Sequence, residues 1–312
     1  MRRAHWALKL VLSLTLLGLL FYFVDVRTAL AALWALGPRE LGAVIALTVV
    51  AMLVGAWRFQ RILFHLGEEL AFAPLLGDTL VGTAYNLLLP TTIGGDIARG
   101  LRSADRAKDA PRVWAALAFE RMLGLVTLAL MALVGVVALS SALPLSLLVP
   151  SLLVVATITL VALGLPRLLT LLARRWGQGK TGKVLSVSAL ALAEALNGPL
   201  ARNRVRLETL GASLLYQLVS LSILAVVVPQ PSVEHVLGIY VGVPLALIAA
   251  MVPITIGGVG LRESLFVVVL APFGFTREQA FALALVWLGS SLIAALAGAL
   301  VLATERRAHV AT

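Results

Sequence analysis

The sequence predicts an all-α polytopic membrane protein, with about six full membrane spans and two re-entrant broken helices arranged as an inverted repeat. Three observations support this prediction. Of the 312 residues, 61% are hydrophobic and only 13% are charged, about half the charged share of an average soluble domain. Long apolar stretches recur along the chain, and two of them end in related proline–glycine motifs. A soluble protein of this length needs more polar side chains to cover its surface.

The composition also excludes several kinds of site. The chain has no cysteine, so it has no disulfides, thiolate nucleophiles or cysteine metal ligands. Its four histidines are scattered without a metal-binding spacing, and we expect no metal and no cofactor. A net charge of +10 would suggest nucleic acid in a soluble protein. Here most basic residues flank apolar stretches, so we expect no nucleic-acid partner.

Six stretches are long enough to be full spans, because a bilayer core about 30 Å thick requires ~20 apolar residues per helix. They are Trp6–Val24, Leu41–Trp57, Val113–Leu139, Leu145–Leu165, Thr209–Val228 and Gln279–Ala303. The first stretch also has features of a cleavable signal peptide, with Ala29-Leu30-Ala31 as a weak cleavage site. An uncleaved signal-anchor is the favoured interpretation, since multi-span proteins commonly begin this way.

Lysine and arginine in short loops set the orientation of the spans. The first nine residues carry three basic side chains, which predicts a cytoplasmic N-terminus. The loop Ser140–Pro144 has no charge, whereas the strongly basic segment Pro166–Lys183 follows the fourth span. Arg306 and Arg307 place the C-terminus on the cytoplasmic side as well. We therefore expect a multi-pass protein of the cytoplasmic (inner) cell membrane with both termini in the cytoplasm.

Two further apolar segments, Leu75–Leu89 and Val236–Val252, end in breaks. The breaks contain Pro90, Gly94 and Gly95 in the first segment and Pro253, Gly257 and Gly258 in the second. A full crossing by either segment would move the next basic loop to the wrong side. We interpret both as re-entrant, the first entering from inside and the second from outside. Broken backbone at membrane depth requires surrounding protein or a water-filled cavity, so these breaks should line a cavity.

The two breaks also form an internal repeat, P-x-T-I-G-G-x-x-x-R, which ends at Arg99 and at Arg262. Within a single membrane domain of residues 1–312, segment 41–139 starts outside and segment 209–303 starts inside. Segment 140–208 connects them with one span and the basic cytoplasmic segment. Oppositely oriented halves with matching interrupted helices are typical of transporters with a site at the membrane midplane. The alternative is that the motif is only a turn between helices.

Charged residues at membrane depth are candidates for the site, because each costs at least ~2.5–3.5 kcal/mol to insert. They are Asp78, Asp96, Arg99, Glu120, Arg121, Arg262 and Glu263. We expect Glu120 to pair with Arg99 or Arg262, leaving an arginine for an anionic headgroup, since its planar donors grip phosphate bidentately. The alternative is a closed network that only holds the re-entrant elements.

Polar stripes at helical spacing accompany these charges and should face protein or water. One runs from Asp78 through Gly82 to Tyr85 and Asn86, and a second contains Gln217. The full set of candidate substrate-binding residues is Asp78, Tyr85, Asn86, Pro90, Gly94, Gly95, Asp96, Arg99, Glu120, Arg121, Gln217, Pro253, Gly257, Gly258, Arg262 and Glu263. We interpret a ridge of small residues, Ser290, Ala294 and Gly298, as a helix-packing surface.

Four stretches carry a family resemblance. They are Trp57–Leu63, then Asn86–Pro90 with Gly94–Arg99, then Phe119–Arg121, and finally Val252–Pro253 with Gly257–Glu263. In this order they resemble the transmembrane region of lysylphosphatidylglycerol synthases, which is the flippase half of bacterial multiple-peptide-resistance factors, and its stand-alone relatives. The resemblance implies an inner-membrane protein that moves lipids between leaflets. We expect a stand-alone member without the aminoacylating activity, because nothing after Thr304 could hold the soluble synthase domain.

The favoured function is therefore a lipid flippase or transporter for an anionic or phosphate-bearing lipid, with membrane lipids as partners. The oligomeric state is left open, a homo-oligomer included. One alternative is a secondary carrier for a small anion, and another is a membrane-embedded enzyme acting on a lipid-linked substrate. We expect no enzyme, because the acidic cluster has no neighbouring histidine, no paired-carboxylate metal motif and no long loop for a donor substrate.

Overall fold

A computed structural model of the protein describes residues 14–15, 18–88, 94–138, 153, 156–157, 164, 168, 170–171, 180–251 and 260–310. These residues form helices and turns, with no strand among them, and the all-α prediction is confirmed. The elements are α2 (Val26–Trp34), α3 (Pro38–His65), α4 (Phe72–Leu88), α5 (Gly94–Ala104), α6 (Ala110–Ala138), α8 (Lys180–Asn197), η1 (Pro199–Ala201), α9 (Asn203–Ala225), α10 (Val233–Leu237), η2 (Gly238–Gly242), α11 (Val243–Ala250), α12 (Leu261–Leu270), η3 (Ala271–Phe273) and α13 (Arg277–Val310).

Five helical segments in the described ranges are long and apolar enough to cross a membrane, which confirms the polytopic class. They are Pro38–His65, Ala110–Val134, Asn203–Ala225, Val233–Ala250 and Arg277–Glu305. Four of them overlap predicted spans. Of the other two predicted spans, Trp6–Val24 lies about half outside the described residues and Leu145–Leu165 lies largely outside them. Exposed large apolar side chains follow one face of α3 at intervals of four residues, from Leu41 to Trp57, which is the pattern of a lipid-facing helix.

The fifth segment, Val233–Ala250, covers most of the stretch predicted to be re-entrant. Its helix runs on from α10 through the π-helical η2 into α11. By length and composition it could cross a membrane. The break that follows it lies outside the described residues, as does most of the first break, so both re-entrant interpretations and the number of spans stay predictions.

The two predicted halves contain the same order of elements. Each half has a long helix, then one of intermediate length, then a short helix and a second long helix. These are α3, α4, α5 and α6 in the first half, and α9, α10–α11, α12 and α13 in the second. An internal repeat predicts this shared order of helices. The opposite orientation of the two halves in the membrane stays a prediction. The shared arginine differs in position, because Arg99 is the sixth residue of α5 whereas Arg262 is the second residue of α12.

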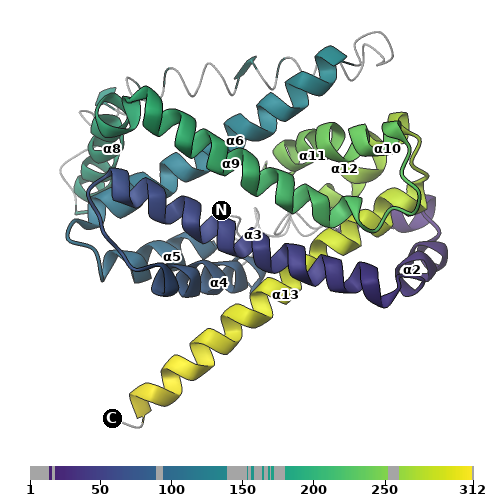
Figure 1. Cartoon of the computed structure of the whole chain (residues 1–312), viewed down its shortest axis with the longest axis horizontal. Coiled ribbons are helices and arrows are strands. Elements are labelled where there is room, and N and C mark those ends of the chain that lie inside the picture. The colour runs from purple at the N-terminus through teal and green to yellow at the C-terminus, as the bar shows by residue number, and fades with distance from the viewer. Residues whose placement is uncertain are drawn as a thin grey trace.

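Figure 1 shows how the long helices are arranged. Helices α3, α6 and α9 run across the molecule, with α4 and α5 toward one end and α10 to α12 toward the other. Helix α13 crosses diagonally, and its C-terminal end extends beyond the other helices. Two large apolar clusters pack this arrangement: one contains Leu224 and Phe266, and the other contains Phe59 and Leu123.

The ridge of small residues is a packing surface, as predicted. Ser290 and Ala294 are buried, and helix α13 packs extensively against α4. At Gly298 the two backbones approach so closely that an added Cβ would lie 2.1 Å from the Leu80 carbonyl oxygen. Only glycine can occupy this point without moving one of the helices.

Candidate functional site

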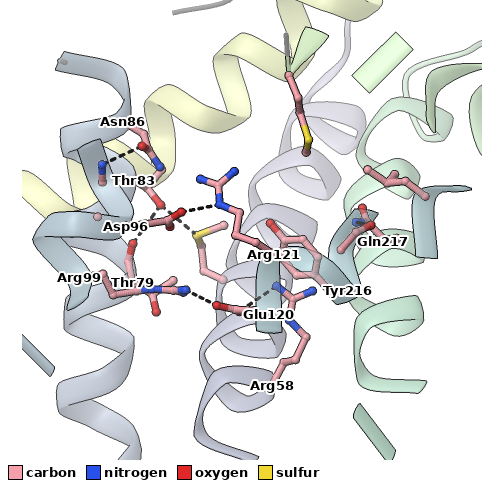
Figure 2. Close-up of a pocket in the computed structure, with 17 residues that line it drawn as sticks. Arg58, Thr79, Thr83, Asn86, Asp96, Arg99, Glu120, Arg121, Tyr216 and Gln217 are labelled. Atoms are coloured by element: carbon pink, nitrogen blue, oxygen red, sulfur yellow. Dashed lines mark hydrogen bonds and ion pairs between the residues drawn. The ribbon is translucent and has the colours of Figure 1, made fainter. Parts of the chain in front are cut away.

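A polar cavity of about 260 Å³ lies among α3, α4, α5, α6 and α9 (Figure 2). Its lining residues are Met52, Gly55, Arg58, Thr79, Gly82, Thr83, Asn86, Gly95, Asp96, Arg99, Glu120, Arg121, Gly124, Leu128, Tyr216, Gln217 and Met251. Along α3 and α9 these residues fall between the members of the two apolar clusters. The cavity therefore lies near the middle of three candidate spans, with apolar packing toward both of their ends.

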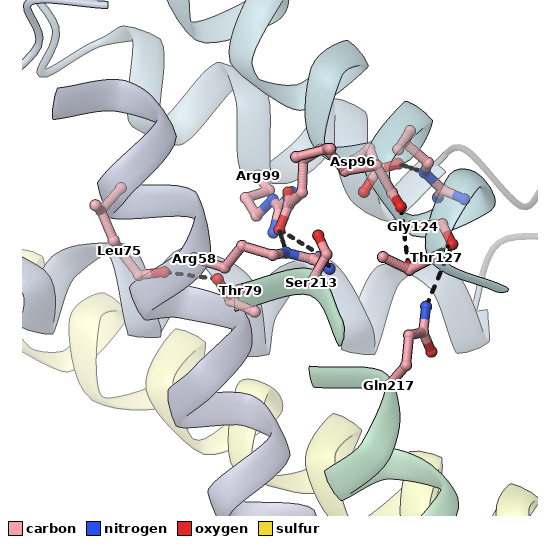
Figure 3. A network of polar contacts seen from close by, with 12 residues as sticks. Arg58, Leu75, Thr79, Asp96, Arg99, Gly124, Thr127, Ser213 and Gln217 are labelled. Atoms are coloured by element: carbon pink, nitrogen blue, oxygen red, sulfur yellow. Dashed lines mark hydrogen bonds and ion pairs between the residues drawn. The ribbon is translucent and has the colours of Figure 1, made fainter. Parts of the chain in front are cut away.

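Glu120 is the centre of the charged network in the cavity. Its side chain is only 4% exposed. Arg58 donates to Glu120 Oε1 from Nη2 at 2.8 Å and from Nε at 3.2 Å, and Arg99 donates to Oε2 from Nη2. Arg58 also donates from Nη1 to the Ser213 hydroxyl at 3.2 Å (Figure 3). One buried carboxylate thus faces two buried guanidinium groups, so this group of three carries a net positive charge.

Aromatic rings support both arginines. The Arg58 guanidinium lies 4.6 Å from the Tyr216 ring centroid, and the Arg99 guanidinium lies 4.4 Å from that of Phe59. Such cation–π contacts are strengthened by desolvation. Arg99 is 8% exposed, and its buried Nε has no hydrogen-bond partner among the described residues. A buried donor of this kind is unfavourable unless an acceptor binds it, and Arg99 lines the cavity from which an acceptor could approach.

A second ion pair, between Asp96 and Arg121, is more exposed. Arg121 Nε donates to Asp96 Oδ2, and the two side chains are 41% and 22% exposed for Arg121 and Asp96 respectively. Glu120 and Arg121, although adjacent on α6, contact different partners, as their separation around a helix predicts. Figure 2 shows Arg121 and Asp96 on one side of the cavity and Glu120 with its arginines on the other.

Two glycines permit the helix crossing that brings α5 to the cavity. A Cβ added at Gly95 would lie 2.0 Å from the Gly82 carbonyl oxygen. Beside this contact, the Gly95 N–H donates to Asn86 Oδ1 at 2.8 Å. The polar stripe on α4 therefore meets the first turn of α5, and this contact positions Asp96 and Arg99 in the cavity.

The structure brings seven of the sixteen predicted site residues to this cavity: Asn86, Gly95, Asp96, Arg99, Glu120, Arg121 and Gln217. Gly94 and Tyr85 are described but do not line it. Pro90, Pro253, Gly257 and Gly258 lie outside the described residues. Whether any of these residues binds substrate stays a prediction.

Asp78 belongs to a different cluster. It is completely buried and accepts hydrogen bonds from Arg102, Arg106 and Ser103. Arg102 continues from there to Glu305 near the end of α13, at 2.7 Å. The charge of Asp78 is thus neutralised by Arg102 and Arg106, which are not among the charged residues predicted at membrane depth. These contacts connect α4, α5 and α13.

Arg262 and Glu263 also lie apart from the cavity. Arg262 Nη2 donates to Glu263 Oε1 at 2.6 Å, and Glu263 Oε2 accepts the Gly260 N–H at 2.8 Å. The alternative pairing of Glu120 with Arg262 is wrong, because Glu263 caps the first turn of α12 and holds Arg262 there. Glu120 does pair with Arg99, the other expected partner.

Arg58 and Tyr216 are the cavity residues whose importance the sequence analysis missed. The predicted span ended at Trp57, where the apolar run stops, whereas α3 continues to His65. The buried face of α3 includes Gly55, Arg58 and Ile62, at helical spacing. That periodicity is the signal that could have placed Arg58 within the helix.

Among the described residues, the charged lining of the cavity comprises three arginines and two carboxylates, a formal net charge of +1. Threonine hydroxyls and two side-chain amides add neutral donors and acceptors. Such a donor set is suited to phosphate, which guanidinium groups can bind through parallel hydrogen bonds. In the part of the chain that the structure describes, no group of three or more histidine or acidic side chains could hold a metal ion.

Together, the fold and the cavity define a polytopic all-α membrane protein with a cationic cavity lined by the candidate spans α3, α6 and α9 together with α4 and α5. The family model for the lysylphosphatidylglycerol synthase TM region matches residues 6–298. The chain therefore belongs to this family, and the resemblance seen in its motifs is confirmed. No curated protein matches the chain. Membership of the family indicates a function connected with membrane lipids.

Proposed function

We propose that the protein is a lipid flippase or transporter, not an enzyme, which moves an anionic or phosphate-bearing lipid between the leaflets of the cytoplasmic membrane. The headgroup passes through the cavity while the acyl chains stay in the bilayer. The observation that supports this most directly is the pair of buried arginines, Arg58 and Arg99, which share the single carboxylate of Glu120 midway along the spans. Both chain termini are cytoplasmic in this proposal.

Charge and size both favour a phosphate-bearing headgroup. A phosphodiester carries one negative charge, which would neutralise the formal net charge of +1 in the cavity. A water molecule takes about 30 Å³ of liquid volume, so a cavity of about 260 Å³ has room for a phosphate and a small polar group. The acyl chains remain outside it in this proposal.

The unpartnered Nε of Arg99 and the two cation–π contacts explain how the cavity can bind an anion reversibly. Glu120 and the aromatic rings of Phe59 and Tyr216 stabilise the guanidinium groups when no headgroup is bound. A bound phosphate then adds hydrogen bonds, but it does not have to neutralise the buried charges of Arg58 and Arg99 by itself. Such a balance allows the headgroup to enter and also to leave.

The test is lipid movement in reconstituted vesicles. Fluorescent phosphatidylglycerol is placed in both leaflets, and an impermeant quencher reports how fast the inner pool becomes accessible. We expect Arg99→Gln and Arg58→Gln to slow this movement at least tenfold relative to wild type. Arg39→Gln is the matched control, because Arg39 is exposed near the start of the same helix α3 and lies outside the cavity lining.

Two results would contradict the proposal. The first is lipid movement in wild-type vesicles no faster than in protein-free vesicles. The second is equal slowing by Arg39→Gln and Arg99→Gln. If the same inactive vesicles took up inorganic phosphate, the cavity would instead belong to a carrier for a small anion.

A further inference from the structure

A second cationic depression lies next to the cavity along α3, where Arg61 of the depression follows the cavity residue Arg58 by about one helical turn. It has a volume of about 310 Å³ and lies between the C-terminal end of α3 and the N-terminal end of α9. In Figure 1 these two helix ends lie on the same side of the molecule as α8. Arg61 and His65 line the depression from α3, while Arg202 and Arg204 line it from the start of α9. None of its lining residues lines the central cavity.

Glu208 is the single acid among the described residues that line this depression, and it is already engaged. Arg61 Nε donates to Glu208 Oε1 at 2.5 Å, and His65 Nε2 lies 3.1 Å from Oε2. Arg202 and Arg204 are exposed, and no ion pair joins either of them to another described residue. Arg202 and Arg204 therefore line the same depression as the Arg61–Glu208 pair, and neither is neutralised by a described acidic residue.

The depression lies where the lipid-facing surface of the spans ends. Phe64, which lines it, is 49% exposed, and Leu207 on the adjoining turn of α9 is 71% exposed. Further exposed apolar residues continue along the same two helices, including Trp57 on α3 and Leu214 on α9. A charged depression at the end of an apolar surface matches a phospholipid, which carries its phosphate at the end of its acyl chains.

We infer that this depression binds the phosphate group of an anionic membrane lipid, held by Arg202 and Arg204 with Arg61 beside them. The acyl chains lie along the exposed surfaces of α3 and α9. Arg202, Arg204 and Arg206 precede the predicted span Thr209–Val228, and this positive charge predicts that the site lies in the cytoplasmic leaflet. The site is distinct from the cavity of the proposed transport route, since the two share no lining residue. The bound lipid instead stabilises the contact between α3 and α9.

The test counts lipids that stay bound to the intact protein. Wild-type protein is titrated with phosphatidylglycerol against a background of phosphatidylcholine, and complexes are resolved by native mass spectrometry. We expect the double variant Arg202→Gln/Arg204→Gln to bind the tightest phosphatidylglycerol about tenfold more weakly. The double variant Arg206→Gln/Arg39→Gln removes the same charge from exposed residues outside the depression, and it should bind as wild type does.

A third variant should act in the opposite direction. Glu208→Gln removes the only acid and releases Arg61, so we expect it to bind phosphatidylglycerol several-fold more tightly than wild type. Damage to the fold would weaken binding instead. The readout is binding alone, so it is independent of whether the protein transports lipid.

Two outcomes would overturn the inference. Equal affinities for the two double variants would show that total charge, not this depression, attracts the lipid. Displacement of phosphatidylglycerol by an equal concentration of glycerol phosphate would assign the depression to a water-soluble phosphate compound and not to a lipid.

Discussion

At the scale of single residues, Glu120 determines whether two buried arginines can exist in the molecule. Arg58 and Arg99 are both at least nine-tenths buried, and each bonds a different oxygen of this carboxylate. A buried ion pair contributes little net stability when it is compared with apolar packing, but removal of one partner leaves an uncompensated charge. Here the loss of the Glu120 carboxylate would leave two uncompensated guanidinium charges.

Glu120→Gln should therefore lower the free energy of unfolding by about 3–5 kcal/mol, the usual effect of breaking a buried ion pair. The measurement is chemical unfolding in detergent, followed by tryptophan fluorescence. Glu305→Gln is the control, because Glu305 pairs with Arg102 but its side chain is 46% exposed, and exposed pairs contribute about 0–1 kcal/mol. A similar loss in both variants would argue against the central role of Glu120.

The sequence predicted one ion pair of this charged network, between Glu120 and Arg99. Charged residues in apolar surroundings pointed to Glu120 and Arg99, because burial of a charge requires a partner. Arg58 was missed because apolarity alone marks where a lipid-facing surface ends, and α3 continues beyond that point as a helix buried on one face. Arg262 was expected in the same group, but its immediate neighbour Glu263 holds it elsewhere, which no spacing rule would have shown.

At the scale of helices, the site depends on how closely α4 and α5 cross. Gly95→Ala would place a Cβ 2.0 Å from the Gly82 carbonyl oxygen, so the helices must separate. We expect a stability loss of about 1–3 kcal/mol from overpacking and a marked fall in lipid movement. In Gly211→Ala the new Cβ meets nothing within 4 Å, so stability should stay level or rise by about 0.5–1 kcal/mol. Both variants are compared by unfolding and by the vesicle assay.

Helix α13 offers a matched pair of glycines for testing its contact with α4. At Gly298 a Cβ would lie 2.1 Å from the Leu80 carbonyl oxygen, whereas at Gly289 nothing lies within 4 Å. Gly298→Ala should lower the midpoint of thermal unfolding in detergent, and Gly289→Ala should leave it unchanged or raise it slightly. Equal midpoints would mean that α13 and α4 are not in close contact in the protein.

The sequence was informative about helices and less so about their ends and crossings. Four predicted spans correspond to α3, α6, α9 and α13, because long apolar runs reflect burial in lipid or protein. The ends differ by up to eight residues, as in α3, which ends at His65 rather than at Trp57. The crossing of α4 and α5 depends on a contact between two distant glycines, Gly82 and Gly95, which local composition does not encode.

At the scale of the whole molecule, the orientation of the two halves can be tested directly, because the chain contains no cysteine. Single cysteines at Ser140 and at Gly179 provide unique labels without altering any other residue. An impermeant maleimide applied to intact cells should label Ser140→Cys, and it should label Gly179→Cys only after the membrane is opened. The reverse pattern would contradict both the proposed orientation and the inverted repeat.

The halves share their order of helices but differ in what they contribute to the cavity. Arg99 reaches the cavity from the middle of α5, whereas Arg262 lies in the first turn of α12 beside Glu263. The repeated motif predicted equivalence, and the structure shows that the shared arginines have different partners. The cationic cavity is therefore built mainly by the first half, together with α9.

The net charge of the cavity has a consequence for the energy source of the proposed transport. With a singly charged headgroup bound, the cavity is neutral, and without one its charged lining sums to +1. A membrane potential acts with about 2.3 kcal/mol per charge for each 100 mV across the full field. In the proposed transport, an electrically negative cell interior therefore attracts the positively charged empty cavity toward the cytoplasm. It exerts no net force on the neutral, loaded cavity. Voltage alone would then bias the return of the empty cavity in the proposed transport and so favour one direction of lipid movement.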